Sequence, residues 1–356
     1  MTEILRPDLL WIEGRCYRVN DPIADTSGVQ EHDLYENESR YNEYDDEEDE
    51  DTFQVLMMDD SRFKTSFHVS KHYIGSIIGK KGATKSRIER DTRTEIKIPR
   101  QGQDGDIVIL GPAESNVRVA RRRINIIVIS SRMKQKPTHF ISIPMNQPNI
   151  MQRFELFKES VLRDCTGRGL DESLFIEAQK LHLTLGVMCL MDNEERLVAS
   201  KLLTEARDKV VKPLLEGHPP LQIRLKGISY MNDDPKEIHV LYGIVQEEGK
   251  GLLQLLGDRL VDHFYRAGFM DREFGRENIK LHVTLINSKY RSRAVGSNDE
   301  GIPSRNSRQP RESFDGSEVL RKFADFDFGV VELRNIHLSQ RFSLGPDGYY
   351  QPTCII

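Results

Sequence analysis

After residue 62, short stretches of alternating apolar and polar residues are separated by longer stretches of helical spacing. Alternation is the period of a half-buried strand, whereas apolar residues three or four apart form one face of a helix. Between residues 63 and 136 the pattern predicts strands and helices in the order β-α-α-β-β-α, at 67–69, 73–78, 83–92, 95–99, 107–110 and 114–133. From residue 137 to 356 it predicts helices at 151–163, 193–211, 252–267 and 317–323, and strands at 138–144, 180–185, 221–225, 238–245, 280–285 and 328–342. The expected fold class is α+β, in two folded domains.

One hexapeptide occurs twice in the second domain, 100 residues apart: Lys180-Leu181-His182-Leu183-Thr184-Leu185 and Lys280-Leu281-His282-Val283-Thr284-Leu285. On a strand, residues i and i+2 share a face, so each His stands beside its Thr while aliphatic residues point to the core. Two imidazoles in one pocket can act as a paired general base and general acid. The repeat therefore predicts two small sheets, each lining a cleft with one His/Thr pair that acts on a phosphodiester.

Other interpretations of the histidines compete with this one. A single His-x-Thr on a strand is usually structural, but two near-identical copies favour a shared phosphate pocket. A metal site needs a third ligand, and neither motif has a neighbouring His, Cys or carboxylate, so no metal or cofactor is expected. His139, His239 and His337 also fall on predicted strands, and we expect them to be ordinary core or rim residues; the face that His337 occupies stays open.

Charge is distributed unevenly along the chain. Residues 1–62 hold 5 Lys/Arg and 19 Asp/Glu, a balance of −14, whereas residues 63–136 hold 17 and 6, a balance of +11. The arm from 20 to 62 is expected to be disordered because its like charges repel, while residues 9–19 are apolar enough to dock on this protein or a partner. No apolar run approaches the roughly 20 residues of a membrane span. Four scattered cysteines predict reduced thiols in the cytosol or nucleus.

The basic segment carries Gly79-Lys80-Lys81-Gly82 between its first two predicted helices. This loop, in the order βααββα, resembles a type I KH domain, which implies that the loop clamps the backbone of single-stranded RNA or DNA. Glycines let the main chain approach a phosphate, and the helix behind them offers free N–H groups. Lys85 departs from the aliphatic residue usual in this family, which puts the form of the base groove in doubt. The run at 121–123 is expected to be a solvated basic face.

The two His-x-Thr motifs resemble the 2H phosphoesterase superfamily, and within it the branch of A-kinase-anchoring-protein-like domains. This resemblance implies metal-free cleavage of a phosphodiester, with one His as base, the other as acid, and Thr184 and Thr284 holding phosphate oxygens. Which His is the base stays open. The order of acidic arm (1–62), KH domain (63–136) and two-histidine domain (137–356) is similar to one subunit of a nuclear assembly. That similarity implies a helicase and further subunits as partners, roles in transcription coactivation and the response to alkylation damage, and a nuclear location, with the cytoplasm as an alternative.

Two functions compete. The first is an RNA-directed phosphodiesterase in which the KH domain captures single-stranded RNA for the two-histidine cleft. The second is a non-catalytic subunit in which the same cleft binds phosphate ends. Intact motifs favour catalysis. Residues 290–311, rich in Ser, Gly, Asn and Arg, are expected to form a long mobile loop, and occlusion of the cleft by that loop would favour binding.

Overall fold

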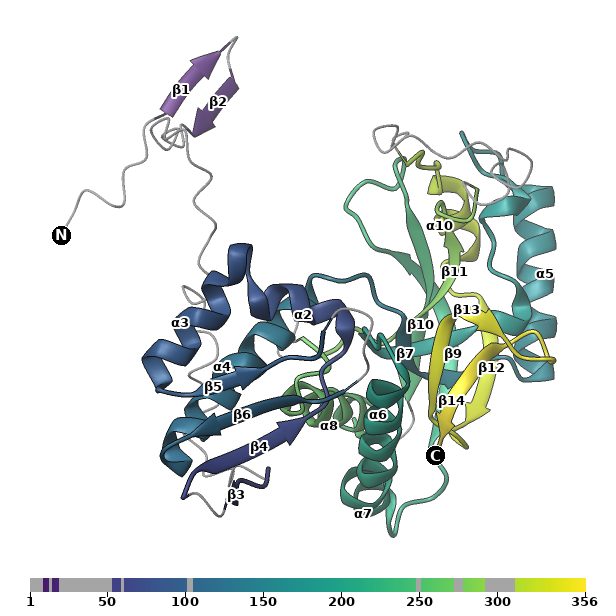
Figure 1. Ribbon diagram of the computed structural model, residues 1–356. Coiled ribbons are helices and arrows are strands. Elements are labelled where there is room, and N and C mark those ends of the chain that lie inside the picture. Colours follow the sequence, from purple (N-terminus) through teal and green to yellow (C-terminus); the bar gives the residue numbers. More distant parts are fainter. Residues whose placement is uncertain are drawn as a thin grey trace. The chain divides into compact units, whose positions relative to one another are not determined.

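The computed structural model describes residues 9–12, 15–18, 53–58, 61–100, 105–247, 251–271, 278–291 and 311–356 (Figure 1). The chain divides into two compact units, residues 1–50 and 51–356. In the first unit the described residues form an antiparallel hairpin of β1 (Leu9–Ile12) and β2 (Arg15–Arg18). Most of the acidic arm lies outside the described residues, and so does most of the segment at 290–311.

The first domain of the second unit is a four-stranded antiparallel sheet packed against three helices. The sheet order is β3-β4-β6-β5. The core is built from the apolar stripes of the helices and the inner face of the sheet, including Tyr73, Ile88, Ile109 and Ile124. The elements are β3 (Leu56–Met57), β4 (Phe63–Phe67), α2 (Lys71–Ile78), α3 (Ala83–Thr92), β5 (Glu95–Lys97), β6 (Ile107–Gly111) and α4 (Glu114–Met133). This is the predicted order with an added edge strand, and the first predicted strand begins earlier, at Phe63.

The second domain is built on eight strands in the order β12-β9-β10-β11-β8-β7-β13-β14. Its strands are β7 (His139–Pro144), β8 (His182–Met188), β9 (Gln222–Tyr230), β10 (Val240–Glu247), β11 (His282–Asn287), β12 (Asp327–Glu332), β13 (His337–Leu344) and β14 (Tyr350–Ile355). The two halves of this sheet meet where β8 and β11 pair through Leu183 and Val283. The two expected sheets are thus two four-stranded halves that touch along the strands carrying the histidines.

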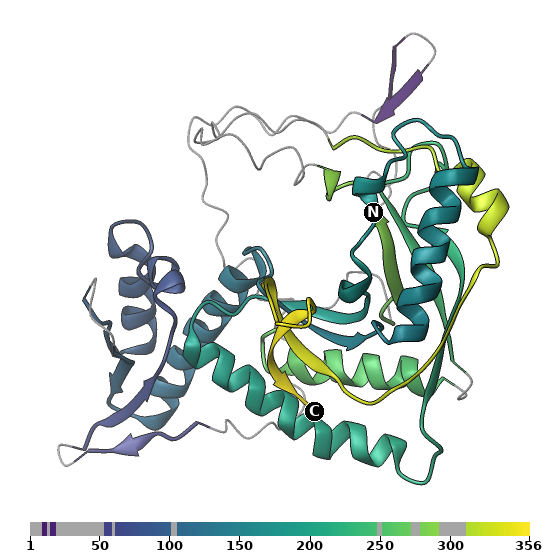
Figure 2. The ribbon, with the colours of Figure 1, turned by 90° about the vertical axis from the view of Figure 1, so that its right-hand side faces the viewer.

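Helices cover the sheet of the second domain. They are α5 (Pro148–Asp164), α6 (Asn193–Ala206), α7 (Lys212–Leu215), α8 (Leu252–Arg266) and α10 (Ser317–Phe323). Helix α5 packs along β12, whereas α6 and α8 lie side by side and contact β14 and β8, respectively (Figure 2). The core includes Phe154, Phe157, Leu183, Phe264 and Val283. Its side chains come from both halves of the sheet, so they fix the two histidine strands relative to each other.

One predicted element of the second domain is wrong. The expected single strand at 328–342 is two strands, β12 and β13, and they lie at different places in the sheet: β12 pairs with β9, and β13 with β7 and β14. The apolar and polar pattern continues across the break, but residues 333–336 leave one half of the sheet and enter the other. The last strand, β14, was not predicted.

A buried charge links the two domains of the second unit. Arg132, near the end of α4, forms an ion pair of 2.6 Å with Glu195 of α6, and both side chains are less than a tenth exposed. Its guanidinium also donates to the carbonyl of Gly268 and lies 4.4 Å from the ring centre of Phe269. His68 reaches Asp192, the residue before α6, at 2.9 Å. The helix that closes the first domain is therefore anchored in the second.

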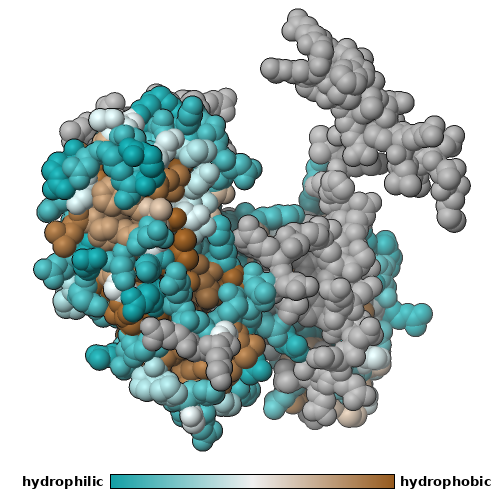
Figure 3. Space-filling model, turned by 180° about the vertical axis from the view of Figure 1, so that it is seen from behind, coloured by the Kyte–Doolittle hydropathy of each residue, from teal (hydrophilic) through white to brown (hydrophobic). Residues whose placement is uncertain are grey.

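The rear surface is largely hydrophilic, with apolar residues exposed between polar ones (Figure 3). Large exposed apolar side chains include Leu156 and Leu162 on α5 and Phe342 and Leu344 on β13. Exposed apolar residues of this kind are normal on a folded protein. Within the described part of the chain, no helix combines the length and apolar character needed to cross a membrane.

Candidate active site and nucleic-acid loop

The two His-x-Thr motifs lie side by side on the central strands β8 and β11. Along each motif the aliphatic residues after the His are buried and the His and Thr are half-buried, as the alternation predicts. The antiparallel pair Leu183 with Val283 sets the register of the two strands. Continued by one residue in each direction, that register places His182 beside Thr284 and Thr184 beside His282. The two His/Thr pairs therefore lie on adjacent strands, next to each other.

Both imidazole rings are held by the same hydrogen bond. His182 Nδ1 lies 2.7 Å from the carbonyl oxygen of Lys180, and His282 Nδ1 lies 2.7 Å from that of Lys280. A carbonyl oxygen can only accept, so Nδ1 carries the proton and donates it in both rings. Nε2 is then the atom that gains or loses a proton. The motif thus orients its own ring through the residue two positions earlier.

Aromatic rings enclose His182. The ring centres of Phe140 and Tyr350 lie 5.0 and 5.2 Å from that of His182. The pKa of His182 is lowered to about 4, mainly by desolvation; the hydrogen bond to Lys180 opposes this shift, and the nearby charge of His282 adds to it. His182 is therefore neutral at physiological pH, with an unprotonated Nε2.

The surroundings of His282 differ. Its ring centre is 5.4 Å from that of Tyr242, a residue opposite Thr284 on β10. Lys280 Nζ lies 4.6 Å from the centre of the same Tyr242 ring. Burial raises the pKa of the Tyr242 hydroxyl, but hydrogen bonds to Lys280 and Ser229 and the charge of Lys280 outweigh it, and the pKa is lowered. A cationic and an aromatic group therefore border this half of the site.

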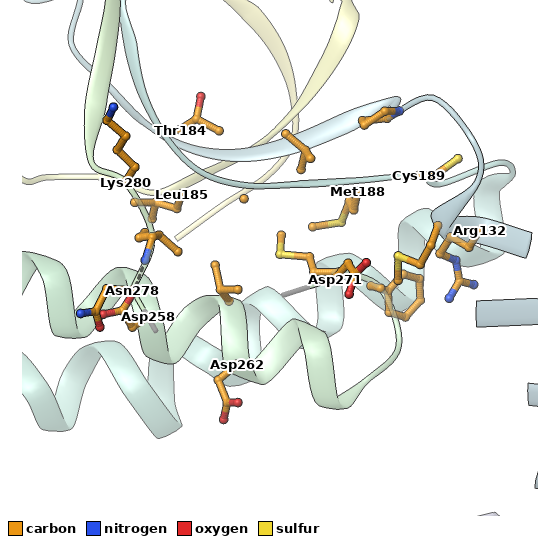
Figure 4. Close-up of a pocket in the computed structure, with 18 of the residues that line it drawn as sticks. Arg132, Thr184, Leu185, Met188, Cys189, Asp258, Asp262, Asp271, Asn278 and Lys280 are labelled. Carbon is orange, nitrogen blue, oxygen red and sulfur yellow. Dashed lines mark hydrogen bonds between the residues drawn. The ribbon is translucent and has the colours of Figure 1, made fainter. Parts of the chain in front are cut away.

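A cavity of about 1140 Å³ adjoins the site. Thr184, Lys280 and His282 line one part of it, and Arg132 and Met188 another. His182 and Thr284 are not in its lining, so the cavity borders the two-histidine site without containing all of it. Figure 4 shows the Lys280 amine and the Thr184 hydroxyl extending to the same side, away from the α8 carboxylate of Asp262.

Buried polar and aromatic groups from β7, β13 and β14 lie beside the first motif. Ser142 lies opposite Thr184 on β7, is fully buried, and its Oγ is 3.0 Å from the hydroxyl of Tyr349. His337 lies opposite Ser142 on the next strand, with its ring centre 5.7 Å from that of Tyr349. His337 therefore lies on the same face of the sheet as Ser142 and Thr184, because residues opposite each other in a sheet share a face. In the sequence, the signal for aromatic residues beside this motif is the adjacent pair Tyr349-Tyr350.

His139 and His239, the two other histidines predicted on strands, have structural hydrogen bonds. His139 is buried and its Nδ1 is 2.9 Å from the hydroxyl of Thr138; burial, with the charge of Arg196, lowers its pKa to about 4. His239 lies 3.3 Å from the hydroxyl of Ser288. Both occupy the core or rim positions expected for them. No group of three His, Cys, Asp or Glu side chains that could hold a metal occurs among the residues for which the structure gives positions.

The Gly79–Gly82 loop has the backbone expected of a phosphate-binding turn. Gly79 and Gly82 have φ of 69° and 82°, and a Cβ at Gly79 would collide with the hydroxyl of Thr84. Lys80 and Lys81 are exposed, and Lys81 itself has φ of 53°. Helix α3 starts directly after the loop without a side-chain cap, so the N–H groups of its first turn are open to an anion.

Two details of the basic domain differ from expectation or extend it. Lys85 pairs with Glu89 at 2.7 Å, and Glu89 also accepts the backbone N–H of Ile96, so the unusual lysine lies in a polar network. The prediction that residues 121–123 form a solvated face is wrong for Arg121. This guanidinium stacks 3.0 Å from the centre of the Phe67 ring, and burial lowers its pKa to about 9.

Comparison with known proteins gives the family. Residues 137–356 match the model of the AKAP7 2'5' RNA ligase-like domain, and residues 64–126 match that of the KH domain. The chain is 34% identical over 355 residues to "Activating signal cointegrator 1 complex subunit 1" of Mus musculus, a match that covers 98% of this chain and 97% of the relative. It is 24% identical over 151 residues to the uncharacterized protein C15D4.13c of Schizosaccharomyces pombe, which covers 42% of this chain and 66% of the relative.

Two solved structures are also similar. The first type I KH domain of human vigilin matches with 21% identity and a TM-score of 0.22, covering 26% of this chain and 97% of that one. The protein TT0787 of Thermus thermophilus matches with 17% identity and a TM-score of 0.36, covering 62% of this chain and 96% of that one. The family models and the mouse relative carry the conclusion: the chain belongs to the family of activating signal cointegrator 1 complex subunit 1, in which a KH RNA-binding domain precedes a 2H phosphoesterase-like domain. The predicted resemblance to these families is confirmed.

Proposed function

We propose that this protein is an RNA-binding phosphodiesterase that cleaves by metal-free acid/base chemistry between its two histidines. The observation that carries the proposal is the matched pair of Nδ1 hydrogen bonds to Lys180 and Lys280. These bonds leave Nε2 of each ring as the proton-transferring atom, on two adjacent strands. A pair that served only the fold would not need the same free nitrogen on both rings.

The different surroundings of the rings support a division of roles. Neutral His182 accepts the proton of a ribose 2′-hydroxyl or a water through Nε2 as the oxygen–phosphorus bond forms. His282, in its protonated form, donates a proton to the leaving oxygen as the opposite phosphorus–oxygen bond breaks. Thr184 and Thr284 donate hydrogen bonds to the non-bridging oxygens, where negative charge increases in the transition state. The KH loop at Gly79–Gly82 holds single-stranded RNA by its backbone.

The direct test is to incubate the purified protein with defined single-stranded RNA oligonucleotides, including substrates that end in a cyclic phosphate, and to identify the product ends by mass spectrometry. We expect shortened or opened products with wild-type protein and none with His182→Ala or His282→Ala. Binding of these RNAs without any product would instead support the alternative function, a non-catalytic subunit that binds phosphate ends.

We also propose that the protein belongs to an activating signal cointegrator 1 complex, together with a helicase, that it acts in transcription coactivation and the response to alkylation damage, and that it resides in the nucleus. The support is the 34% identity to the mouse subunit of that name over nearly the whole length of both chains. Affinity purification from cells should recover a helicase with this protein, and microscopy of the tagged protein should show it in the nucleus. Purification without a helicase, or a purely cytoplasmic signal, would contradict this proposal.

A further inference from the structure

The two hexapeptides are nearly identical, but the structure does not treat their lysines alike. Lys180 Nζ forms an ion pair of 2.5 Å with Glu177, and the lysine side chain is 18% exposed. Lys280 is exposed, and its described contacts are the ring and hydroxyl of Tyr242 and the sulfur of Met231, which lies 3.7 Å from Nζ. A carboxylate thus pairs with the first lysine, whereas the second lies against an aromatic ring and a thioether.

The position of Lys280 directs its charge toward the two-histidine site. Lys280, His282 and Thr284 are alternate residues, which share a face in extended chain. The Lys280 amine and the Thr184 hydroxyl extend to the same side in Figure 4. Lys280 and Thr184 both line the cavity that borders the site, as does His282. An anion held by the threonines would therefore lie near a lysine amine.

Tyr242 connects this lysine to the histidine on the same segment. It is 7% exposed, its ring centre lies 4.6 Å from Lys280 Nζ and 5.4 Å from the ring centre of His282, and its register partner is Thr284. A cation over an aromatic face is attracted to the ring without losing its charge, unlike a cation paired with a carboxylate. The ring can thus hold the lysine in place and leave its charge available to a ligand.

We infer that Lys280 is the phosphate-binding cation of the site, that Tyr242 positions it, and that Lys180 has no such role. The inference rests on the proposed function, because it assigns to Lys280 the non-bridging oxygens of the same phosphodiester. A cation there stabilises the charge that increases on those oxygens in the transition state. The two motifs therefore differ in the role of their lysines: Lys180 pairs with Glu177, and Lys280 is positioned by an aromatic ring beside the phosphate.

The test compares Lys280→Met with Lys280→Arg, Lys180→Met and Lys209→Met. Lys209 is exposed, pairs with Glu205 and does not line the cavity beside the site, so it controls for the loss of a surface charge. With the RNA substrate that wild-type protein cleaves, we expect Lys280→Met to lower kcat/KM about 100-fold, in the range for loss of one group that stabilises transition-state charge. Lys280→Arg should recover most of the rate, Lys180→Met should lose about threefold at most, and Lys209→Met should match wild type. Equal losses for Lys280→Met and Lys180→Met would overturn the inference.

Tyr242 is tested through Lys280. We expect Tyr242→Leu to weaken phosphate binding by nearly as much as Lys280→Met, and the double variant to be little worse than either one, because the two side chains act as a unit. If the loss of phosphate affinity in the double variant equalled the product of the two single losses, Tyr242 would not position Lys280.

A binding experiment separates this inference from the proposed function. Calorimetry with adenosine 3′-monophosphate and with uncharged adenosine measures how much the phosphate adds to affinity, without any turnover. We expect wild type and Lys280→Arg to prefer the monophosphate at least tenfold, and Lys280→Met to lose most of that preference. If no RNA is cleaved but the preference depends on Lys280, the phosphodiesterase fails and the phosphate site stands. If RNA is cleaved and Lys280→Met keeps the preference, the inference fails and the phosphodiesterase stands.

Discussion

Replacing Arg132 with Met should destabilise the protein more than any change to a surface ion pair. Arg132 belongs to the last helix of the KH domain, and its partner Glu195 belongs to the phosphoesterase-like domain. Both side chains are less than a tenth exposed, and Arg132 also donates to the carbonyl of Gly268. In Arg132→Met the carboxylate of Glu195 stays buried, with the backbone N–H of Met191 as a remaining donor at 2.7 Å.

The expected loss in the free energy of unfolding follows from the buried, unpaired carboxylate of Glu195. Removing one partner of a buried ion pair costs about 3–5 kcal/mol, because the other charge remains out of water without compensation. The free energy of unfolding of a domain is only about 5–15 kcal/mol, so the loss is a large fraction of it. The double variant Arg132→Met with Glu195→Gln should recover at least about 2 kcal/mol of the loss. Glutamine carries no charge, and its carbonyl oxygen can still accept the Met191 N–H.

Urea denaturation followed by circular dichroism measures these free energies. Lys209→Met removes an exposed lysine from its pair with Glu205, and it should change the free energy of unfolding by less than about 1 kcal/mol. We also expect Arg132→Met to separate the unfolding of the two domains into two transitions, since this contact crosses between them. A loss below about 1 kcal/mol for Arg132→Met, or a double variant no more stable than the single one, would refute this reasoning.

Two further predictions concern RNA and pH. Replacing both Lys80 and Lys81 with Asp should weaken binding of single-stranded RNA severalfold and reduce its salt dependence, because fewer counterions are released; an unchanged gel-shift affinity and salt slope would mean that the loop is not the contact. The rate of RNA cleavage should stay high as the pH is lowered through 6.5 and fall only as it approaches about 4, because desolvation lowers the pKa of His182 and a base must be unprotonated to act. A pH–rate profile whose acid limb lies near 6.5 would count against His182 as the base.

The sequence predicted the local geometry of the site correctly, whereas the roles of these residues stay predictions. The period of two placed His182 and Thr184 on one face of a strand, and a glycine-bounded loop before a helix predicted an anion site at Gly79–Gly82. Local pattern also gave the order of elements in the KH domain. In each case the deciding interactions lie within a few residues of one another.

What the sequence could not show depends on distant contacts. Residues 328–342 read as one strand because the apolar pattern does not record that the chain crosses from one half of the sheet to the other. Tyr350 comes from a strand that was not predicted, and it reaches His182 only through the pairing of β13 with β14. Lys180 and Lys280 look equivalent in sequence, and what distinguishes Lys280 in the structure is its contact with Tyr242 of another strand. The buried pair of Arg132 with Glu195 gives no local signal at all.

The central claim is that His182 and His282 act as one acid/base pair, and the kinetics of three variants test it most directly. With the best RNA substrate, single-turnover rates are measured for His182→Ala, His282→Ala and the double variant, with and without EDTA. We predict that each single variant loses nearly all activity, that the double variant is little slower than either, because groups that act as a unit are strongly non-additive, and that EDTA changes nothing. A single variant that cleaves at the wild-type rate, or activity that EDTA removes, would contradict the account.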